Sequence, residues 1–530
     1  MTRRLLRHLR IVVALAVFVG FTAAFSDFRN LVPDGLGSWL ASTQLVPSLM
    51  MLATGVAFSA GCLLVLLLTL AVGRVYCSAL CPLGILQDII SRSAGFLRLK
   101  KPLLPHARPF TKLRWSFLGG TTLAVLAGWG ALALALLDPY SNFGRIAAGL
   151  FRPLITLANN SVVTSANAIG LRSVYRIDVH WAGAWALAVP VVILALVTIM
   201  AALRGRLYCN TVCPVGTLLG FVSRHAAFRL RIAPGACVKC GQCLRHCKAQ
   251  CIDLRAGTID ASRCVACYDC INACDEAGIG YAFAWKPSPS APARPDAGTP
   301  SDPRRRTFLA DAAAAAAAVM MTGKLAGADT SAGENTSALV KTGQACGGVV
   351  PPGAANLGRF LDRCTACHLC ISACPTQVLR PALLEYGLAG LLKPRLDYET
   401  AFCNFDCIRC GEVCPSGAIL PLAPADKQAA RIGVADFHSS RCIVVTNGTD
   451  CAACSEHCPT KAVSTEPYGN NLRLPVLNQD ACIGCGACEY ACPVRPVKAI
   501  RVTGLRRHGR AVKLIEKKPA ARASGADFPF

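Results

Sequence analysis

The sequence predicts a multi-domain fold in which an all-α domain of four transmembrane helices precedes small α+β domains rich in cysteine. Three observations predict it. The chain has 530 residues, enough for several domains. It is 53% hydrophobic with a mean hydropathy of +0.43, which is more apolar than an ordinary soluble protein. Its 31 cysteines come in short, regularly spaced groups, so metal ligation is favoured over disulfide cross-linking.

Four apolar stretches define the expected transmembrane helices, at residues 11–25, 45–73, 115–137 and 181–203. The last three carry no charged side chain. The first is shorter than the roughly 20 apolar residues that a helix needs to cross a bilayer, so a buried or re-entrant segment is the alternative there. The first domain therefore extends over residues 1–231 and contacts membrane lipid.

Basic residues beside these stretches predict the orientation of the chain. The first ten residues hold four arginines, residues 74–114 hold eight Lys or Arg against Asp88 alone, and residues 204–231 hold five Arg and no acid. Positive loops stay in the cytoplasm, so residues 26–44 and 138–180 face the other side. Membrane topology thus explains the net charge of +25 better than a nucleic-acid partner does.

The sequence repeats itself after the second and fourth apolar stretches, as GRVYCSALCPLGILQDIISR at 73–92 and GRLYCNTVCPVGTLLGFVSR at 205–224. Two expected spans separate the copies, so both emerge at the same membrane face. The cysteines of the two C-x3-C-P motifs can therefore meet and form a metal or cluster site, or redox-active disulfides; a purely structural cap is the alternative. These cysteines are Cys77, Cys81, Cys209 and Cys213.

Residues 232–285 contain two runs with the spacing C-x2-C-x2-C-x3-C, which is typical of bacterial two-cluster ferredoxins. Three thiolates on one tight loop cap three corners of a cubane, and the fourth cysteine of each run ligates the other cluster. Zinc sites usually have two C-x2-C pairs farther apart. We expect one 4Fe-4S cluster at Cys237, Cys240, Cys243 and Cys274, and another at Cys264, Cys267, Cys270 and Cys247. Cys62 and Cys251 are expected to be packing residues.

A Pro-rich linker at 286–303 leads to a segment at 304–328 that resembles a twin-arginine export signal. Arg305 and Arg306 are followed by a short, weakly apolar run and by the small-residue site Ala326-Gly327-Ala328, in the order that such signals have. An Ala-rich helical linker is the alternative. If the segment is a signal, the residues after Ala328 lie in the periplasm, whereas the N-terminus and the first cluster domain are cytoplasmic.

The last expected domain, residues 340–505, carries four more cysteine runs and predicts four more 4Fe-4S clusters, which makes six clusters and about 24 iron atoms in all. Because the two outer runs have the standard spacing and the two inner runs do not, matching like with like predicts nested pairing, outer with outer and inner with inner. The runs are Cys364, Cys367, Cys370, Cys374; Cys403, Cys407, Cys410, Cys414; Cys442, Cys451, Cys454, Cys458; and Cys482, Cys485, Cys488, Cys492.

Other cofactors are not expected. The motif CTACH at 364–368 matches a c-type haem attachment site, but it lies inside a cluster run, and no histidine lies in the four apolar stretches. We therefore expect no haem. No P-loop, dinucleotide fingerprint or Ser/His/Asp set has a usable context. The sequence predicts a protein that moves electrons and performs no bond chemistry of its own.

On these motifs, residues 1–285 resemble the NapH/MauN family of membrane ferredoxin-type proteins. Residues 304–502 resemble the NapG/MauM family, through the signal-like segment, the lead-in Pro351-Pro352-Gly353-Ala354 and the four runs. The resemblance implies a quinol dehydrogenase of the bacterial inner membrane that takes electrons from the quinol pool and feeds a periplasmic redox partner, most often nitrate reductase. A maturation factor that supplies electrons to a periplasmic metalloenzyme is the alternative. Asp138 and Tyr140, at the end of a span, are candidates for a quinone pocket.

Overall fold

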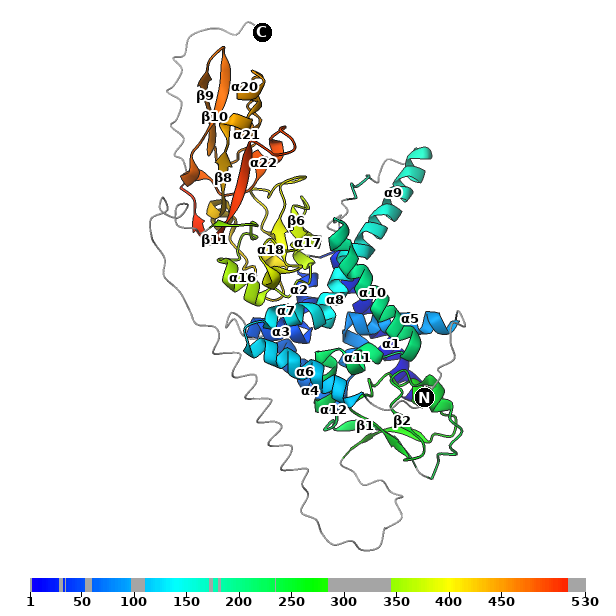
Figure 1. The fold of residues 1–530 in the computed structure, drawn as a ribbon. Coiled ribbons are helices and arrows are strands. Elements are labelled where there is room, and N and C mark those ends of the chain that lie inside the picture. The colour runs from blue at the N-terminus through cyan, green and yellow to red at the C-terminus, as the bar shows by residue number, and fades with distance from the viewer. Residues whose placement is uncertain are drawn as a thin grey trace. The chain divides into compact units, whose positions relative to one another are not determined.

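The computed structural model describes residues 2–27, 32–33, 35–52, 60–96, 110–170, 175–179, 183–233, 235–284 and 345–512 (Figure 1). The expected linker at 286–303 and the signal-like segment at 304–328 lie outside this part of the chain. The chain forms two compact units. The first comprises the described parts of Met1–Ala332, Gly358–Arg395 and Arg409–Pro421, and the second those of Gly333–Leu357, Leu396–Ile408 and Leu422–Phe530.

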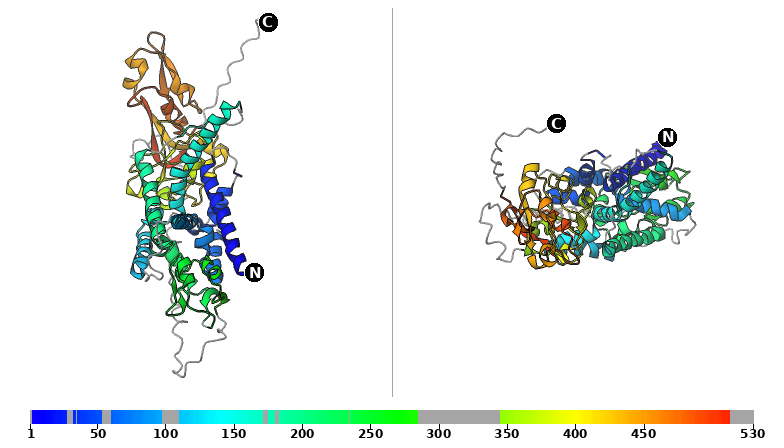
Figure 2. Two further views of the ribbon diagram at one scale, coloured as in Figure 1. Left: turned by 90° about the vertical axis from the view of Figure 1, so that its right-hand side faces the viewer. Right: turned by 90° about the horizontal axis from the view of Figure 1, so that it is seen from above.

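The N-terminal part of the first unit is helical. Figures 1 and 2 show most of its helices gathered in one bundle, from which α9 (Arg152–Ala168) extends. Two π-helical turns, η1 (Tyr76–Leu80) and η2 (Ala147–Phe151), interrupt it. The helices are α1 (Thr2–Ser26), α2 (Leu36–Ser42), α3 (Leu45–Leu52), α4 (Ala60–Val72), α5 (Pro82–Phe96), α6 (Thr111–Leu126), α7 (Gly130–Leu137), α8 (Pro139–Ile146), α9 (Arg152–Ala168), α10 (Ala184–Arg204), α11 (Leu207–Thr211) and α12 (Pro214–Ser223).

Among the described residues, three helical stretches are long and apolar enough to cross a membrane: Leu5–Ser26, Pro139–Ala168 and Ala184–Arg204. The first and the third correspond to expected spans. The expected span at 115–137 is broken between α6 and α7, where Gly128 has a φ of 82°. The expected span at 45–73 contains α3 and α4, and residues 53–59 are not described. The expected four-helix arrangement is therefore confirmed only in part.

The stretch Pro139–Ala168 was expected to be part of a loop outside the membrane. Its helix begins with proline in the first turn, and the Asp138 carboxylate caps it by accepting hydrogen bonds from the Ser141 N–H at 2.8 Å and the Ser141 hydroxyl at 2.7 Å. Arg145 and Arg152 interrupt its apolar sequence. Hydropathy alone missed this helix because Arg145 is fully buried and Arg152 half-buried in the protein instead of facing lipid.

Residues 228–284, called here the first cluster domain, have the expected α+β fold of two short hairpin-like sheets and two short helices. Strand β1 (Phe228–Ile232) pairs antiparallel with β4 (Ile279–Phe283), so that the two ends of the domain lie side by side. Strand β2 (Ile252–Asp253) pairs with β3 (Thr258–Ile259). Helices α13 (Gln242–His246) and α14 (Asp269–Asn272) each follow a cysteine loop.

The C-terminal half repeats this construction. Residues 357–421 carry α16 (Leu357–Arg363), α17 (Leu369–Ala373), β6 (Leu379–Pro381), β7 (Pro394–Leu396) and α18 (Arg409–Glu412). In the second unit, β5 (Ala345–Cys346), β11 (Ile500–Arg510) and β8 (Ala430–Phe437) form one sheet in that order, and β9 (Val463–Tyr468) pairs with β10 (Leu472–Leu477). Its helices are α19 (Pro424–Ala429), α20 (Ile443–Thr446), α21 (Ala453–Glu456) and α22 (Ala487–Ala491).

Candidate iron–sulfur centres

The first cluster domain brings cysteines from both of its runs to one cavity. The cavity is lined by Cys264, Cys267 and Cys270 of the second run and by Cys247, the last cysteine of the first run. This is one of the two ligand sets that the spacing predicts, with the fourth thiol supplied by the other run. Three loop thiols and one returning thiol around a cavity fit a cubane cluster.

Cys251 lines the same cavity, and its sulfur lies 3.7 Å from that of Cys247. Cys251 is buried, with 2% of its surface exposed, as expected of a packing residue, although expected ligands such as Cys270 are buried as well. Its position beside two expected ligands was not predicted. It stands four residues after Cys247, in the position where the sequence pattern leads one to expect a small apolar side chain.

Four cysteine loops share an unusual backbone conformation. In each run of standard spacing, the residues directly before and after the second cysteine have positive φ, between 48° and 80°. This left-handed pair bends the loop around a central point, which lets three thiols of one short segment converge. One loop has glycine at both of these positions, one has it at a single position, and two have none. Residue type alone therefore does not reveal the bend. The pairs are Lys239 and Gly241, Ala266 and Tyr268, Ala366 and His368, and Gly484 and Gly486.

Runs in the C-terminal half pair in sequence order, and the prediction of nested pairing was wrong. A cavity is lined by Cys482, Cys485 and Cys488 together with Cys458 of the preceding run. Burial raises the thiol pKa of Cys364, Cys367 and Cys370, and the nearby Cys414 adds to the rise at all three. Helix α17 packs on α18 and α21 on α22. Consecutive runs meet because closing a short loop costs less entropy than closing a long one, whatever the spacing within each run.

The structure also brings together the four cysteines of the C-x3-C-P copies. Each of them is buried, with 2% or 3% of its surface exposed. The copies interlock: the Arg206 guanidinium donates to the Cys77 carbonyl at 2.7 Å, and the Arg74 guanidinium donates to the Cys209 carbonyl at 3.3 Å. An added Cβ on Gly84 would lie 2.3 Å from the Cys77 carbonyl oxygen, and one on Gly216 would lie 2.2 Å from that of Cys209. The glycine of each motif is therefore required by close packing.

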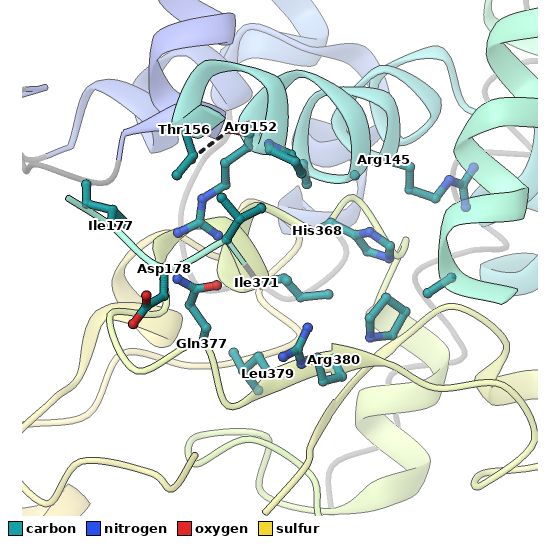
Figure 3. A pocket seen from close by; sticks show the side chains of 16 residues that line it. Arg145, Arg152, Thr156, Ile177, Asp178, His368, Ile371, Gln377, Leu379 and Arg380 are labelled. Atoms are coloured by element: carbon teal, nitrogen blue, oxygen red, sulfur yellow. Dashed lines mark hydrogen bonds between the residues drawn. The ribbon is translucent and has the colours of Figure 1, made fainter. Parts of the chain in front are cut away.

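A separate cavity lies beside the run 364–374, between α9, residues 177–179 and the segment after α17. Figure 3 shows Arg152, Asp178 and Gln377 turned toward one another on one side of it, with His368 on the other. Burial, and then the charge of Arg145, lower the pKa of His368 to about 3, so its ring is neutral. Its Nε2 lies 2.8 Å from the Leu392 carbonyl oxygen, which places the ring proton on Nε2 and leaves Nδ1 as an acceptor.

Asp138 and Tyr140, the candidates for a quinone pocket, do not line this cavity. Both are buried in the helix bundle, and the Asp138 carboxylate is engaged in capping α8. The sequence missed Arg152 and Gln377 because they are ordinary surface residue types whose convergence depends on the packing of distant segments.

Together, the α+β domains and their converging thiols define the class of the protein as a ferredoxin-type iron–sulfur electron-transfer protein. Residues 363–419 and 441–496 each match a family described as a 4Fe-4S dicluster domain, and residues 54–103 and 185–233 match one described as a 4Fe-4S binding domain. The two dicluster matches divide the last four runs into the same sequential pairs that the cavities indicate.

The chain belongs to the NapG/MauM family of ferredoxin-type proteins. It is 34% identical over 163 residues to the ferredoxin-type protein NapG of Escherichia coli K12, and the aligned region covers 29% of this chain and 70% of NapG. It is 31% identical to the methylamine utilization ferredoxin-type protein MauM of Methylorubrum extorquens, over 42% of this chain and 98% of MauM. It is also 28% identical to NapF of Escherichia coli K12, over 29% of this chain and 87% of NapF. No solved structure matches.

Exchanging one cysteine in each pair of runs tests the sequential pairing. In Cys414→Ser, we expect the thiols of Cys364, Cys367 and Cys370 to become reactive toward iodoacetamide in the purified protein, because their cluster loses its fourth ligand. The matched variant Cys492→Ser is expected to expose the thiols of the run that begins at Cys442 and to leave those three protected. Mass spectrometry of the alkylated peptides reads out both patterns. If Cys492→Ser, and not Cys414→Ser, made the thiols of Cys364, Cys367 and Cys370 reactive, the pairing would be nested.

Proposed function

We propose that the protein oxidises quinol at the bacterial inner membrane and passes the electrons through its clusters to a periplasmic reductase, nitrate reductase being the favoured partner. The observation that carries this proposal is the polar cavity beside the run 364–374, next to two helices long enough to cross a membrane. Quinol releases two electrons and two protons as it becomes quinone. Bound 4Fe-4S clusters would accept the electrons one at a time, and the protons would leave to water past Asp178 at the exposed side.

The cavity suits the head group of a quinol. Arg152 and Gln377 offer hydrogen-bond donors to the ring oxygens, and Nδ1 of His368 offers an acceptor to a quinol hydroxyl. Apolar side chains such as Ile371 and Leu379 complete the lining. Arg152 also lies within electrostatic range of Cys374 and Arg380, so a molecule bound to it is close to a cluster run.

The proposed ligands are the 24 cysteines of the six runs, with sequential pairing in the C-terminal half. Electrons can continue toward the end of the chain, because the Cys403 N–H donates a hydrogen bond to the Cys485 carbonyl at 3.0 Å. The ligand sets for the C-terminal half are Cys364, Cys367, Cys370 with Cys414; Cys403, Cys407, Cys410 with Cys374; Cys442, Cys451, Cys454 with Cys492; and Cys482, Cys485, Cys488 with Cys458.

Helix α1 supports the proposed topology, in which the first cluster domain is cytoplasmic and the C-terminal cluster domains are periplasmic. Near its N-terminal end, Arg7 forms an ion pair with Asp269 of the first cluster domain at 2.9 Å. Elsewhere α1 contacts α17, which carries cysteines of the run 364–374. A helix of 25 residues is about 37 Å long, more than the roughly 30 Å of a bilayer's hydrocarbon core. One span can thus connect cluster domains on opposite faces. The resemblance of residues 1–285 to NapH/MauN proteins points the same way.

The quinol site is tested with Arg152→Gln. We expect reduction of the clusters by a short-chain quinol to slow by about 10- to 100-fold, because a hydrogen bond from a charged group contributes about 1.5–3 kcal/mol. Stopped-flow absorbance follows the reduction, and iron content and dithionite reduction show that the clusters are intact. Arg176→Gln, on the same loop as Asp178 but outside the cavity lining, is the matched control and should keep the wild-type rate.

If the clusters of Arg152→Gln and Arg176→Gln were reduced at equal rates, the cavity would not be the quinol site. If wild-type clusters take no electrons from quinol under any condition, quinol oxidation itself is excluded and the maturation-factor function remains. Steady-state turnover with quinol and a purified periplasmic reductase distinguishes these two functions directly.

A further inference from the structure

Residues 382–392, which connect β6 to β7 and are called here the leucine loop, carry an unusual number of exposed leucines. Their sequence is ALLEYGLAGLL, in which Glu385 is the single charged residue. The exposed fraction is 41% for Leu383, 61% for Leu384 and 62% for Leu388. A single exposed leucine is ordinary on a protein surface. Three on one loop of eleven residues give an apolar surface that a partner would explain.

The leucine loop packs beside a helix that is long and apolar enough to cross a membrane. Leu391 and Leu392 share a small core with Ala135 of α7 and Val189 of α10, and the 3-10 turn η4 (Leu388–Gly390) contacts α7. Helix α10 is one of the three stretches that can span a bilayer. Val189 is its sixth residue and therefore lies about 7.5 Å along the helix from its first residue. The loop thus meets α10 inside the span, near its N-terminal end.

Hydrogen bonds within the leucine loop satisfy backbone groups that lipid could not. The N–H groups of Leu383 and Leu384 donate to the Glu385 carboxylate at 2.6 and 3.0 Å. The Leu392 N–H donates to the Ala382 carbonyl at 2.8 Å and closes the loop. An unpaired backbone group is costly to move out of water, so internal pairing lowers the cost of bringing this loop to a membrane.

The charge of the loop is compensated as well. The Glu385 carboxylate forms an ion pair with Arg395 at 2.8 Å. A paired carboxylate costs less to remove from water than a free one. The aromatic residue of the loop, Tyr386, is buried and packs edge-on against Phe360 with the ring centroids 6.3 Å apart. The loop is thus held to its cluster domain through Tyr386, while the three leucines stay exposed.

We infer that the leucine loop inserts into the periplasmic leaflet of the membrane, where Leu383, Leu384 and Leu388 contact acyl chains at their boundary with the head groups. Apolar side chains of peripheral segments reach about 5–10 Å into this boundary, which matches the depth at which the loop meets α10. The insertion rests on α10 crossing the membrane. The choice of leaflet rests on the proposed topology, in which the segment before α10 is periplasmic.

Insertion also has a consequence for the cavity beside the run 364–374, because both ends of the leucine loop border it. Pro381, directly before the loop, lines the cavity, and the Leu392 carbonyl oxygen lies 2.8 Å from Nε2 of His368. An inserted loop holds the cavity at the level of the lipid head groups. The ring of a quinol can then bind in the cavity while its isoprenoid tail stays in lipid. This consequence rests on the proposed function, whereas the insertion does not.

Photocrosslinking tests the insertion. The full-length protein, with p-benzoylphenylalanine in place of Leu388, is reconstituted into phosphatidylcholine vesicles and irradiated. We expect lipid adducts on the peptide that contains residue 388, detected by mass spectrometry. Val476, an exposed apolar residue of β10, is the matched control position and should give none. Absence of lipid adducts at 388, or equal amounts at both positions, would overturn the inference. Adducts between two copies of the chain would assign this surface to a second copy and would overturn it too.

Leu384→Gln/Leu388→Gln tests the consequence for quinol. Cluster reduction by a quinol with a full isoprenoid tail in the vesicle membrane should slow by about tenfold, the effect of exposing about two methylene groups of the tail to water. Reduction by a short-chain quinol should keep the wild-type rate, and Val476→Gln should keep both rates.

The outcomes separate the insertion from the proposed function. Equal slowing with both quinols would show damage to the cavity, and wild-type rates with both would exclude the route for the tail. If neither quinol reduces the wild-type clusters, the proposed function is wrong, and the lipid adducts at position 388 alone decide whether the loop inserts.

Discussion

Replacing Asp88 by Asn is expected to destabilise the helical domain by about 3–5 kcal/mol, the usual cost of removing one partner from a buried ion pair. The Asp88 carboxylate is the anion at the centre of three cations from three other segments of the first unit. Their distances from its oxygens are 2.9 Å for Arg10, 2.8 Å for Arg206 and 3.3 Å for Lys248. The Arg206 side chain is fully buried. In the Asp88→Asn variant, Arg10 and Arg206 would lose their carboxylate partner, whereas Lys248 would keep its ion pair with Asp269 at 3.0 Å.

The same site predicts that the stability of the protein decreases at acidic pH. Burial alone would raise the pKa of Asp88, but Arg206, Lys248 and Arg10 together hold it well below its ordinary value. A carboxyl whose pKa is depressed in the folded state stabilises the protein above its unfolded pKa, about 3.9, and loses that contribution as the pH falls toward the folded value. The wild type should therefore lose stability below about pH 4.

Thermal unfolding in detergent between pH 3 and pH 7 measures both effects. Asp88→Asn should unfold at a lower temperature than the wild type at pH 7, and the difference should shrink as the pH falls below about 4. Asp275→Asn is the control, because Asp275 is exposed in the first cluster domain, and surface substitutions usually change stability by less than about 0.5 kcal/mol. A pH-independent difference would mean that Asp88 stabilises the fold by packing and not by charge.

Local spacing predicted those parts of the site that depend on one short segment. The run spacing placed Cys264, Cys267 and Cys270 around one cavity, and the crossing rule of two-cluster ferredoxins supplied Cys247. Such loops need no information from the rest of the chain. The choice of partner run is different, because it depends on which helices pack together, and similarity of spacing was an unsuitable guide to it.

Buried charge was the other feature that the sequence concealed. Counting charges identified Asp88 as the one acid among eight basic residues in 74–114, yet it did not predict that the carboxylate joins three segments. Arginines of the two copies were counted as topology signals, whereas Arg74 and Arg206 reach across to the other copy. A signal was present in the repeat, since both copies keep the arginine and the glycine of G-R-x-Y-C-x3-C-P-x-G. Residues kept in both copies of an internal repeat are those that hold the copies together.

Changing Arg305 and Arg306 together to Lys is expected to abolish export of the C-terminal cluster domains. Export systems read a twin-arginine signal as an address, and if residues 304–328 are such a signal, Arg305 and Arg306 are its paired arginines. A fusion to alkaline phosphatase or to green fluorescent protein after Gly504 reports its location. In the wild type it should read periplasmic, and in the double variant cytoplasmic. A fusion after Ala284 should read cytoplasmic in both.

Arg304→Lys is the matched control, because it changes a third arginine of the same segment and leaves the pair intact. It should export as the wild type does. The consequence for electron transfer follows from the proposed topology, in which α1 crosses the membrane and contacts α17 on the face opposite to the first cluster domain. In the double variant these two elements would be on different sides of the membrane. Quinol-dependent reduction of a periplasmic acceptor should then be lost together with export. Unchanged export in the double variant would show that residues 304–328 are not a twin-arginine signal.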